Sequence, residues 1–244
     1  MLRELVTGLP RENFIYVADS GHCPYGDKSR EQIVARAVVI TDFLLTRSAK
    51  LVVVACNTAT IAAVEQLRAT YPLSFVGIEP AVKPAAVRSR SGVIGVLATG
   101  AALGGEKLHR LIDRHKGPVR VITQPCPGLV EQVEAGDLGG ERTRALVQRY
   151  TAPLLDAGAD VIVLGCTHYP FLRPLIADVV GQSVSLLDTG EAVARRVVGV
   201  LDEQRLRATR TSPGRIEWFT SGSNEQMRRV GSALWGAPVE GLSL

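Results

Sequence analysis

Short apolar runs rich in β-branched residues alternate with longer segments of helical period along most of the chain. The apolar runs contain few polar positions, which is typical of parallel strands that are buried on both faces. This order of elements predicts an α/β fold, with parallel sheets that helices cover on both sides. We expect strands at 13–19, 51–56, 73–78, 92–97, 118–123, 160–166, 183–188 and 215–222, and helices at 29–48, 58–69, 101–115, 139–157, 170–180, 190–208 and 223–234.

Two of the expected strands end in the same sequence pattern. "AKLVVVACNTAT" (49–60) and "ADVIVLGCTHYP" (159–170) each run from an alanine through apolar residues to a small residue and a cysteine, then to hydrogen-bonding side chains. Because ligands in open α/β sheets bind at the carboxyl ends of the strands, Cys56 and Cys166 fall where ligands bind. A single cysteine there is most simply a small buried apolar residue, but the repetition favours two functional thiols.

The residues after each cysteine can open a helix. A helix N-terminus favours anions, so we expect it to lower the pKa of the thiol beside it. Pro170 suits the first turn of the second helix.

The composition narrows the class of protein. Hydrophobic residues make up 46% and charged residues 21%, which is ordinary for a soluble globular chain. No apolar run reaches the roughly 18 residues of a membrane span and no signal peptide is visible, so we expect a cytoplasmic protein without a membrane partner. The net charge is +4. The arginines are dispersed beside acidic residues and aromatics are only 5%, so we expect no nucleic-acid partner.

Two like thiols suit one particular kind of reaction. Inverting a carbon centre by proton transfer needs a base on one face and an acid on the other, and the two groups exchange roles in reverse. Two cysteines fit when one is thiolate while the other is thiol. The chain has four cysteines but no C-x-x-C pair, so the sequence gives no zinc signature. The glycine-rich stretch 99–107 matches neither a dinucleotide nor a P-loop fingerprint.

Six motifs follow one another along the chain: "CPYGDKS" (23–29), "ACNTAT" (55–60), "GVIGVLAT" (92–99), "GCTHYP" (165–170), "LLDTGEA" (186–192) and "FTSG" (219–222). They resemble, in the same order, the motifs of glutamate racemases in the aspartate/glutamate racemase family, and the resemblance covers nearly the whole chain. The resemblance implies interconversion of L- and D-glutamate without metal or cofactor, and D-glutamate goes into peptidoglycan of the cell wall. Family members are often dimers, which leaves a homodimer open, although the sequence itself does not give the oligomeric state.

The resemblance also implies roles for individual residues. Cys56 and Cys166 would be the two acid/base groups, with Cys56 acting on D-glutamate and Cys166 on L-glutamate. His168 would assist Cys166, and Glu134 would pair with His168. The implied substrate-binding residues are Tyr25, Gly26, Asn57, Thr58, Thr167 and His168.

Simpler interpretations of these residues stay open. Asn57 and Thr58 could only cap the helix that follows them. Tyr25 and Gly26 could form only a turn, and Glu134 could lie on a solvated helical face. Cys23 and Cys126 lie outside the repeat, and we interpret both as structural.

We expect two α/β domains related by a pseudo-twofold axis, with the site in the cleft between them. The first domain would contain residues 1–89 and 191–244, because the strand at 215–222 is expected to rejoin its sheet. The second domain would contain residues 90–190.

The start of the chain departs from the family pattern. The family opens with a strand and a loop reading roughly "GVFDSGxGGL", whereas this chain begins at "MLRELVTGLP". We expect a start codon assigned too late, and a chain that is less stable and less active as written. Two other functions therefore stay open: a catalytically impaired glutamate-binding protein and an aspartate racemase.

Overall fold

The protein is described by a computed structural model that covers residues 1–104 and 106–244. Within these residues every strand pair is parallel, which confirms the α/β class. Gly105, in the helix expected at 101–115, lies outside the described residues. The chain forms two compact units. Unit 1 contains Met1–Ala55, Ala62–Ile78 and Gly190–Leu244, and unit 2 contains Cys56–Ile61 and Glu79–Thr189. The domain boundaries, pseudo-twofold and cleft stay predictions.

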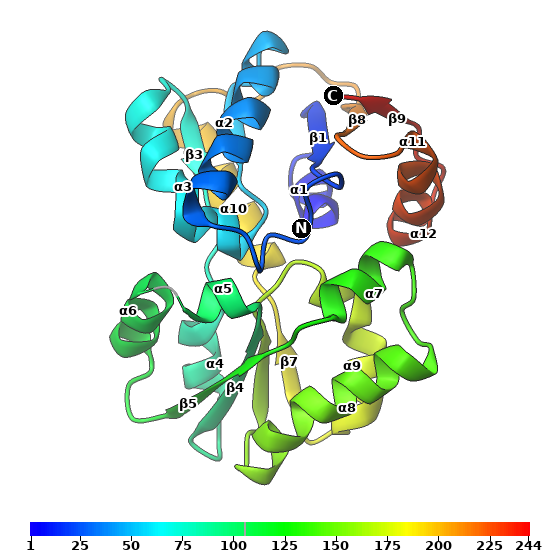
Figure 1. The fold of residues 1–244 in the computed structure, drawn as a ribbon. Helices are drawn as coiled ribbons and strands as arrows, with labels where there is room; N and C mark the ends of the chain where they lie inside the picture. The colour runs from blue at the N-terminus through cyan, green and yellow to red at the C-terminus, as the bar shows by residue number, and fades with distance from the viewer. Residues whose placement is uncertain (105) are drawn as a thin grey trace. The chain divides into compact units, whose positions relative to one another are not determined.

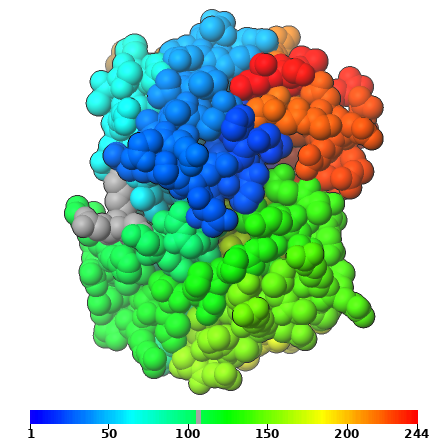
Figure 2. All heavy atoms as spheres, in the orientation of Figure 1, coloured from blue at the N-terminus to red at the C-terminus, as the bar shows by residue number. Residues whose placement is uncertain are grey.

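Unit 1 contains strands from both ends of the chain. β1 (Phe14–Ala18) pairs with β8 (Ile216–Thr220), which pairs with β9 (Gly241–Ser243), and a second sheet joins β2 (Leu51–Val53) to β3 (Ser74–Val76). The space-filling view shows the N-terminal segment in blue against the C-terminal segment in orange and red (Figure 2). The predicted return of the C-terminal strand to the first sheet is therefore confirmed.

Period-two alternation in the strands builds two apolar cores in unit 1. Leu51 and Val53 pack with the helices α1 (Leu2–Gly8) and α10 (Gly190–Glu203). Val52 and Val54 pack instead with residues of α2 (Arg30–Thr46) and α3 (Asn57–Thr70). The strands are therefore covered on both faces, as their apolar sequences predict.

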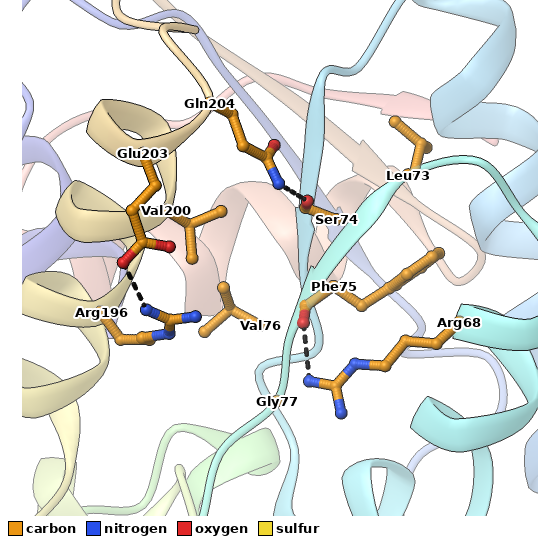
Figure 3. A pocket seen from close by; sticks show the side chains of 10 residues that line it. All are labelled: Arg68, Leu73, Ser74, Phe75, Val76, Gly77, Arg196, Val200, Glu203 and Gln204. Atoms are coloured by element: carbon orange, nitrogen blue, oxygen red, sulfur yellow. Dashed lines mark hydrogen bonds and ion pairs between the residues drawn. The ribbon is translucent and has the colours of Figure 1, made fainter.

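The outer edge of β3 forms a shallow groove of about 440 Å³ between α3 and α10 (Figure 3). The guanidinium of Arg68 donates to the Phe75 carbonyl at 2.8 Å, and the Gln204 amide donates to the Ser74 hydroxyl at 2.6 Å. Arg196 pairs with Glu203 at 3.1 Å. These polar side chains cover a strand edge that could otherwise pair with another chain, so we interpret the groove as a protected edge.

Unit 2 contains one four-stranded sheet in the order β5-β4-β6-β7. The helices α4 (Val82–Arg88) and α6 (Glu106–His115) lie on one face, and α8 (Glu141–Asp156) and α9 (Arg173–Val180) lie on the other (Figure 1). The strands are β4 (Val93–Ala98), β5 (Arg120–Pro125), β6 (Val161–Leu164) and β7 (Ser185–Leu187).

The strand order creates a topological switch point in unit 2. The chain passes from β4 to β5 on one side and then returns to β6 on the other side of β4. Parallel α/β sheets bind ligands outside the carboxyl ends of the strands at such a point. Thr99 follows β4 there, and Gly165 and Cys166 follow β6.

All eight expected strands are present, and the expected helices are also found, some of them in short pieces. The start of the chain, which resembles the family's helix after the opening loop, forms α1. The sequence analysis missed β9, α4 and α7 (Leu129–Ala135). No helix among the described residues is long and apolar enough to cross a bilayer. The remaining short helical elements are α5 (Gly100–Leu103), η1 (Tyr169–Leu172), α11 (Asn224–Gln226), η2 (Met227–Gly231) and α12 (Ser232–Trp235).

The space around two glycines predicts opposite effects on stability when each is replaced by alanine. A Cβ at Gly95 would lie 2.6 Å from Leu154 Cδ1, in a fully buried side chain. Gly95→Ala should therefore lower the free energy of unfolding by about 1–3 kcal/mol. Gly199→Ala, inside α10 where the nearest atom is 3.9 Å away, should raise it by about 0.5–1 kcal/mol. Urea unfolding measures both, and equal effects would contradict the packing argument.

Candidate active site

Cys56 lies between the end of β2 and the first residue of α3. Its carbonyl accepts a hydrogen bond from the Thr60 amide at 2.8 Å, and its Sγ accepts one from the Ala59 amide at 3.4 Å. The cysteine therefore occupies the position of a helix cap, with its sulfur against the first-turn amides.

The helix N-terminus does not make Cys56 acidic in this structure. The pKa of its thiol is raised to about 11: burial and then the charge of Cys166 raise it, and together they outweigh the Ala59 amide and His168, which lower it. The helix amides lower the pKa of the thiol as expected, but desolvation of the thiolate raises this pKa by more. At neutral pH Cys56 is consequently a thiol, which suits a proton donor.

Gly165 places the second cysteine directly at the end of β6. Its amide donates to the Leu97 carbonyl of β4 at 2.8 Å, and a Cβ at this position would lie 2.6 Å from that same oxygen. A larger residue would push the strand end away from β4. The small residue before Cys166 is therefore a requirement of the backbone approach.

Cys166 begins a chain of three polar side chains. Its Sγ lies 3.6 Å from Nδ1 of His168, and Nε2 of His168 lies 2.7 Å from Oε1 of Glu134. The sequence expectation that Glu134 meets His168 is thus realised as a contact. An imidazole between a thiol and a carboxylate can accept the thiol proton while the carboxylate stabilises the imidazolium.

The helix α7 brings Glu134 to this position. Gly128 and Gly136 adopt left-handed conformations, with φ of 86° and 82°, at either end of the helix. Leu129 and Val133 are fully buried, which fixes the helix by its apolar face. Glu134 remains on the partly exposed face, with its side chain 32% exposed.

The two cysteine-bearing segments are joined by a hydrogen bond between their neighbours. The side-chain amide of Asn57 donates to the Gly165 carbonyl at 2.7 Å, and both groups are buried. Asn57 therefore bonds across to β6 instead of capping its own helix. Its Oδ1 is also buried, and no hydrogen-bond partner for it occurs in the part of the chain that the structure describes.

A second contact joins the segment that carries Cys56 to the end of β4. The hydroxyls of Thr58 and Thr99 lie 3.0 Å apart, and Thr99 also caps α5 by accepting a hydrogen bond from the Ala102 amide. The sequence analysis did not select Thr99 or Gly165. The signal for both was their position after a buried strand, inside motifs that had already been noted.

Unit 2 contains seven of the predicted site residues, and two belong to unit 1. Tyr25 and Gly26 lie in the unit 1 segment after β1. Cys126 is buried and its thiol donates to the Gln124 carbonyl at 3.3 Å. The residues in unit 2 are Cys56, Asn57, Thr58, Glu134, Cys166, Thr167 and His168.

The two thiols of this candidate site have unlike environments. Cys56 is held protonated by burial, whereas Cys166 contacts an imidazole that is itself paired to a carboxylate. The charge on Cys166 raises the pKa of Cys56, so ionising one thiol opposes ionisation of the other. Such a pair can supply a base and an acid to the same carbon.

Comparisons with known proteins place the chain in a family with this chemistry. The sequence model of the family described as Asp/Glu/Hydantoin racemase matches residues 1–197. A glutamate racemase from Herpetosiphon aurantiacus is 55% identical over 233 residues, which cover 96% of this chain and 92% of that protein. A glutamate racemase from Ectopseudomonas mendocina is 54% identical over 241 residues, or 98% and 91% of the two chains. The chain therefore belongs to the Asp/Glu/hydantoin racemase family.

A solved structure agrees with this assignment. The crystal structure of Escherichia coli glutamate racemase in complex with L-glutamate and the activator UDP-MurNAc-ala has a TM-score of 0.85 and 30% sequence identity to this chain. The match covers 99% of this chain and 91% of that one. The fold and the sequence thus point to the same family.

The raised pKa of Cys56 predicts how its reactivity depends on pH. Only the thiolate is alkylated, so with a pKa of about 11 the rate for Cys56 should still rise about tenfold per unit between pH 8 and 9.5. Glutathione, a thiol of ordinary pKa, should level off over the same range. The measurement is the rate of iodoacetamide labelling of the Cys56 peptide by mass spectrometry. A plateau below pH 9 would show that the helix effect exceeds the burial effect.

Proposed function

We propose that this chain is a glutamate racemase that interconverts L- and D-glutamate by a two-base mechanism without a cofactor. One observation carries the proposal: the Asn57 side chain bonds the carbonyl before Cys166, so the segments bearing both thiols meet at the switch point of one sheet. The relatives that are more than half identical to this chain are glutamate racemases, which supports glutamate as the substrate.

The unlike environments of the thiols assign their roles. Cys166 loses its proton to Nδ1 of His168, and the resulting thiolate removes the α-proton of L-glutamate. Cys56, held as a thiol, then donates its proton to the opposite face of the carbanion and yields D-glutamate. Cys166 then carries the α-proton, Cys56 is left as thiolate, and His168 still carries the proton that it took from Cys166. The reverse reaction therefore uses the same two thiols with exchanged roles.

Glu134 stabilises the charged form of His168 in this scheme. The imidazolium forms when His168 takes the Cys166 proton, and the carboxylate at 2.7 Å from Nε2 stabilises it. In this proposal the contacts from Cys166 through His168 to Glu134 stabilise the Cys166 thiolate, and Cys56 has no such stabilisation in the scheme.

Asn57 suits recognition of the substrate's amino group. Its buried Oδ1 is an acceptor, and an ammonium group is a donor with three protons. The Thr58 and Thr167 hydroxyls are further polar groups beside the two cysteines and are assigned to the substrate with it. Tyr25 and Gly26 remain substrate-binding residues of the proposal on the strength of their motif.

The proposal includes the cellular role and setting. D-glutamate made by the enzyme enters peptidoglycan and so supports the cell wall and cell shape. We assign the enzyme to the cytoplasm, and a homodimer is the proposed assembly.

The substrate is tested with the purified chain as it stands. Circular dichroism follows loss of optical activity from L-glutamate and, separately, from L-aspartate. Turnover of glutamate at least 100-fold faster than of aspartate supports the proposal. A preference for aspartate would replace it with an aspartate racemase, and binding of glutamate without turnover would leave only a glutamate-binding protein.

Each thiol should serve one enantiomer. Cys56→Ser and Cys166→Ser should each lower racemisation by at least about 10³, because a serine hydroxyl is too weak an acid to provide the base near neutral pH. In D₂O, Cys56→Ser should still exchange the α-proton of L-glutamate slowly, and Cys166→Ser that of D-glutamate. Proton NMR measures the exchange. Loss of the same enantiomer in both variants would disprove the assignment of opposite faces.

Replacing Glu134 should impair one half-reaction. Glu134→Gln should lower racemisation on the order of 10², since the imidazolium loses its carboxylate. Enantiomers have equal free energies, so kcat/KM must fall equally in both directions. Exchange of the D-glutamate α-proton requires only Cys56, so its ratio to racemisation should rise. Glu131→Gln, on the exposed face of the same helix, is the control and should change neither rate. An unchanged ratio in Glu134→Gln would rule out the relay.

A further inference from the structure

The segment after β1 is organised around a single carboxylate. Asp19 follows the last residue of β1, and its side chain is 9% exposed. Arg36 of α2 donates to it through Nε at 3.1 Å and Nη2 at 2.7 Å, one bond to each oxygen. The Ser221 hydroxyl, after β8, donates to Oδ1 at 2.7 Å, and the Tyr25 hydroxyl donates to Oδ2. One side chain thus joins a helix, a strand end and the loop itself.

The carboxylate stays ionised in this environment. Partial burial by itself would raise the pKa of Asp19, but the hydrogen bonds from Arg36, Tyr25 and Ser221 outweigh it and lower the pKa to about 2. Asp19 in turn raises the pKa of Arg36. Both members of the bidentate pair are therefore ionised throughout the physiological range, and the negative charge of Asp19 compensates the positive charge of Arg36.

The same loop contains the residue types of a nucleophilic triad but lacks the geometry. Nδ1 of His22 lies 3.2 Å from Asp19 and 3.5 Å from the Ser221 hydroxyl, so both groups meet one nitrogen. A relay needs the acid and the nucleophile on different ring nitrogens. Ser221 also gives its proton to Asp19. The cluster therefore positions groups and does not activate a serine.

Backbone contacts bind the loop to the end of β8. The Gly21 amide donates to the Ser221 hydroxyl at 3.2 Å, and a Cβ on Gly21 would lie 2.6 Å from the Ser221 carbonyl oxygen. The amides of His22 and Cys23 donate to the Asp19 carbonyl at 2.9 and 3.0 Å. The Lys28 amide closes the turn by donating to the Tyr25 carbonyl at 3.2 Å.

We infer that Asp19 is a positioning residue for glutamate binding: it fixes the Tyr25–Gly26 segment through the Tyr25 hydroxyl and compensates the positive charge of Arg36. The inference rests on the proposed function, which assigns Tyr25 and Gly26 to the substrate. Asp19 itself does not touch the substrate or the reacting atoms. Its contribution is to order a loop that has no helix or strand of its own.

The test compares Asp19→Asn with Tyr25→Phe, which removes only the hydroxyl and keeps the ring. Loss of one hydrogen bond to a charged group should raise KM for glutamate on the order of 10-fold in Tyr25→Phe, and more in Asp19→Asn, with kcat within about threefold. The double variant should resemble Asp19→Asn, because both changes break the same bond. In the ligand-free chain, the amides of residues 22–28 should exchange faster with deuterium while β1 and β8 stay protected.

Asp202→Asn is the matched control. Asp202 also accepts two bonds from one guanidinium, that of Arg207, at 2.6 and 3.3 Å, but it is exposed at the end of α10. This variant should leave both KM and the exchange of residues 22–28 unchanged. If Tyr25→Phe leaves either KM or loop exchange unchanged, the inference is overturned. A wild-type chain that does not racemise glutamate would instead refute the proposed function, and exchange alone would then decide whether Asp19 orders the loop.

Discussion

The hydrogen bond from Asn57 to the Gly165 carbonyl is the interaction on which the site depends. It joins two segments that are 108 residues apart in the chain and that each carry a cysteine as a direct neighbour of the bonded residue. Because both groups are buried, breaking the bond would leave an unsatisfied amide and an unsatisfied carbonyl, at a cost of about 1–3 kcal/mol for each group. The first turn of α3 consequently belongs to unit 2 in its contacts, although the strand before it belongs to unit 1.

The glycine at position 165 makes that bond possible. The close approach of β6 to β4 leaves no space for a side chain there, so the carbonyl is held at a fixed place beside Leu97. A second hydrogen bond, between the hydroxyls of Thr58 and Thr99, links the start of α3 to the end of the neighbouring strand β4. Strand packing therefore determines the positions of the thiols before any substrate is present, which is the pre-organisation that a proton-transfer reaction requires.

The sequence was most informative where the periodicity was strong and the motif was repeated. The strands that end before Cys56 and Cys166 could be predicted because buried parallel strands are nearly all apolar. The short helix α7 could not, since seven residues between two glycines give too little period to recognise, and its Gly128 and Gly136 signals resemble turns. The raised pKa of Cys56 was equally inaccessible. It depends on how deeply the folded chain buries the sulfur, and the sequence pattern shows only the helix that opposes this effect.

The unlike partners of the two thiols are compatible with a reaction between mirror images. A racemase must treat its substrates with equal kcat/KM in both directions, but this equality follows from the equal free energies of the enantiomers and not from symmetry of the protein. The site needs only the correct number of protons: one thiol protonated while the other is ionised. Burial favours the protonated form of Cys56, and the Cys166 thiol lies 3.6 Å from an imidazole nitrogen that can exchange a proton with it. The two directions of a racemisation can therefore begin from different protonation states of one pair of groups and still have equal kcat/KM.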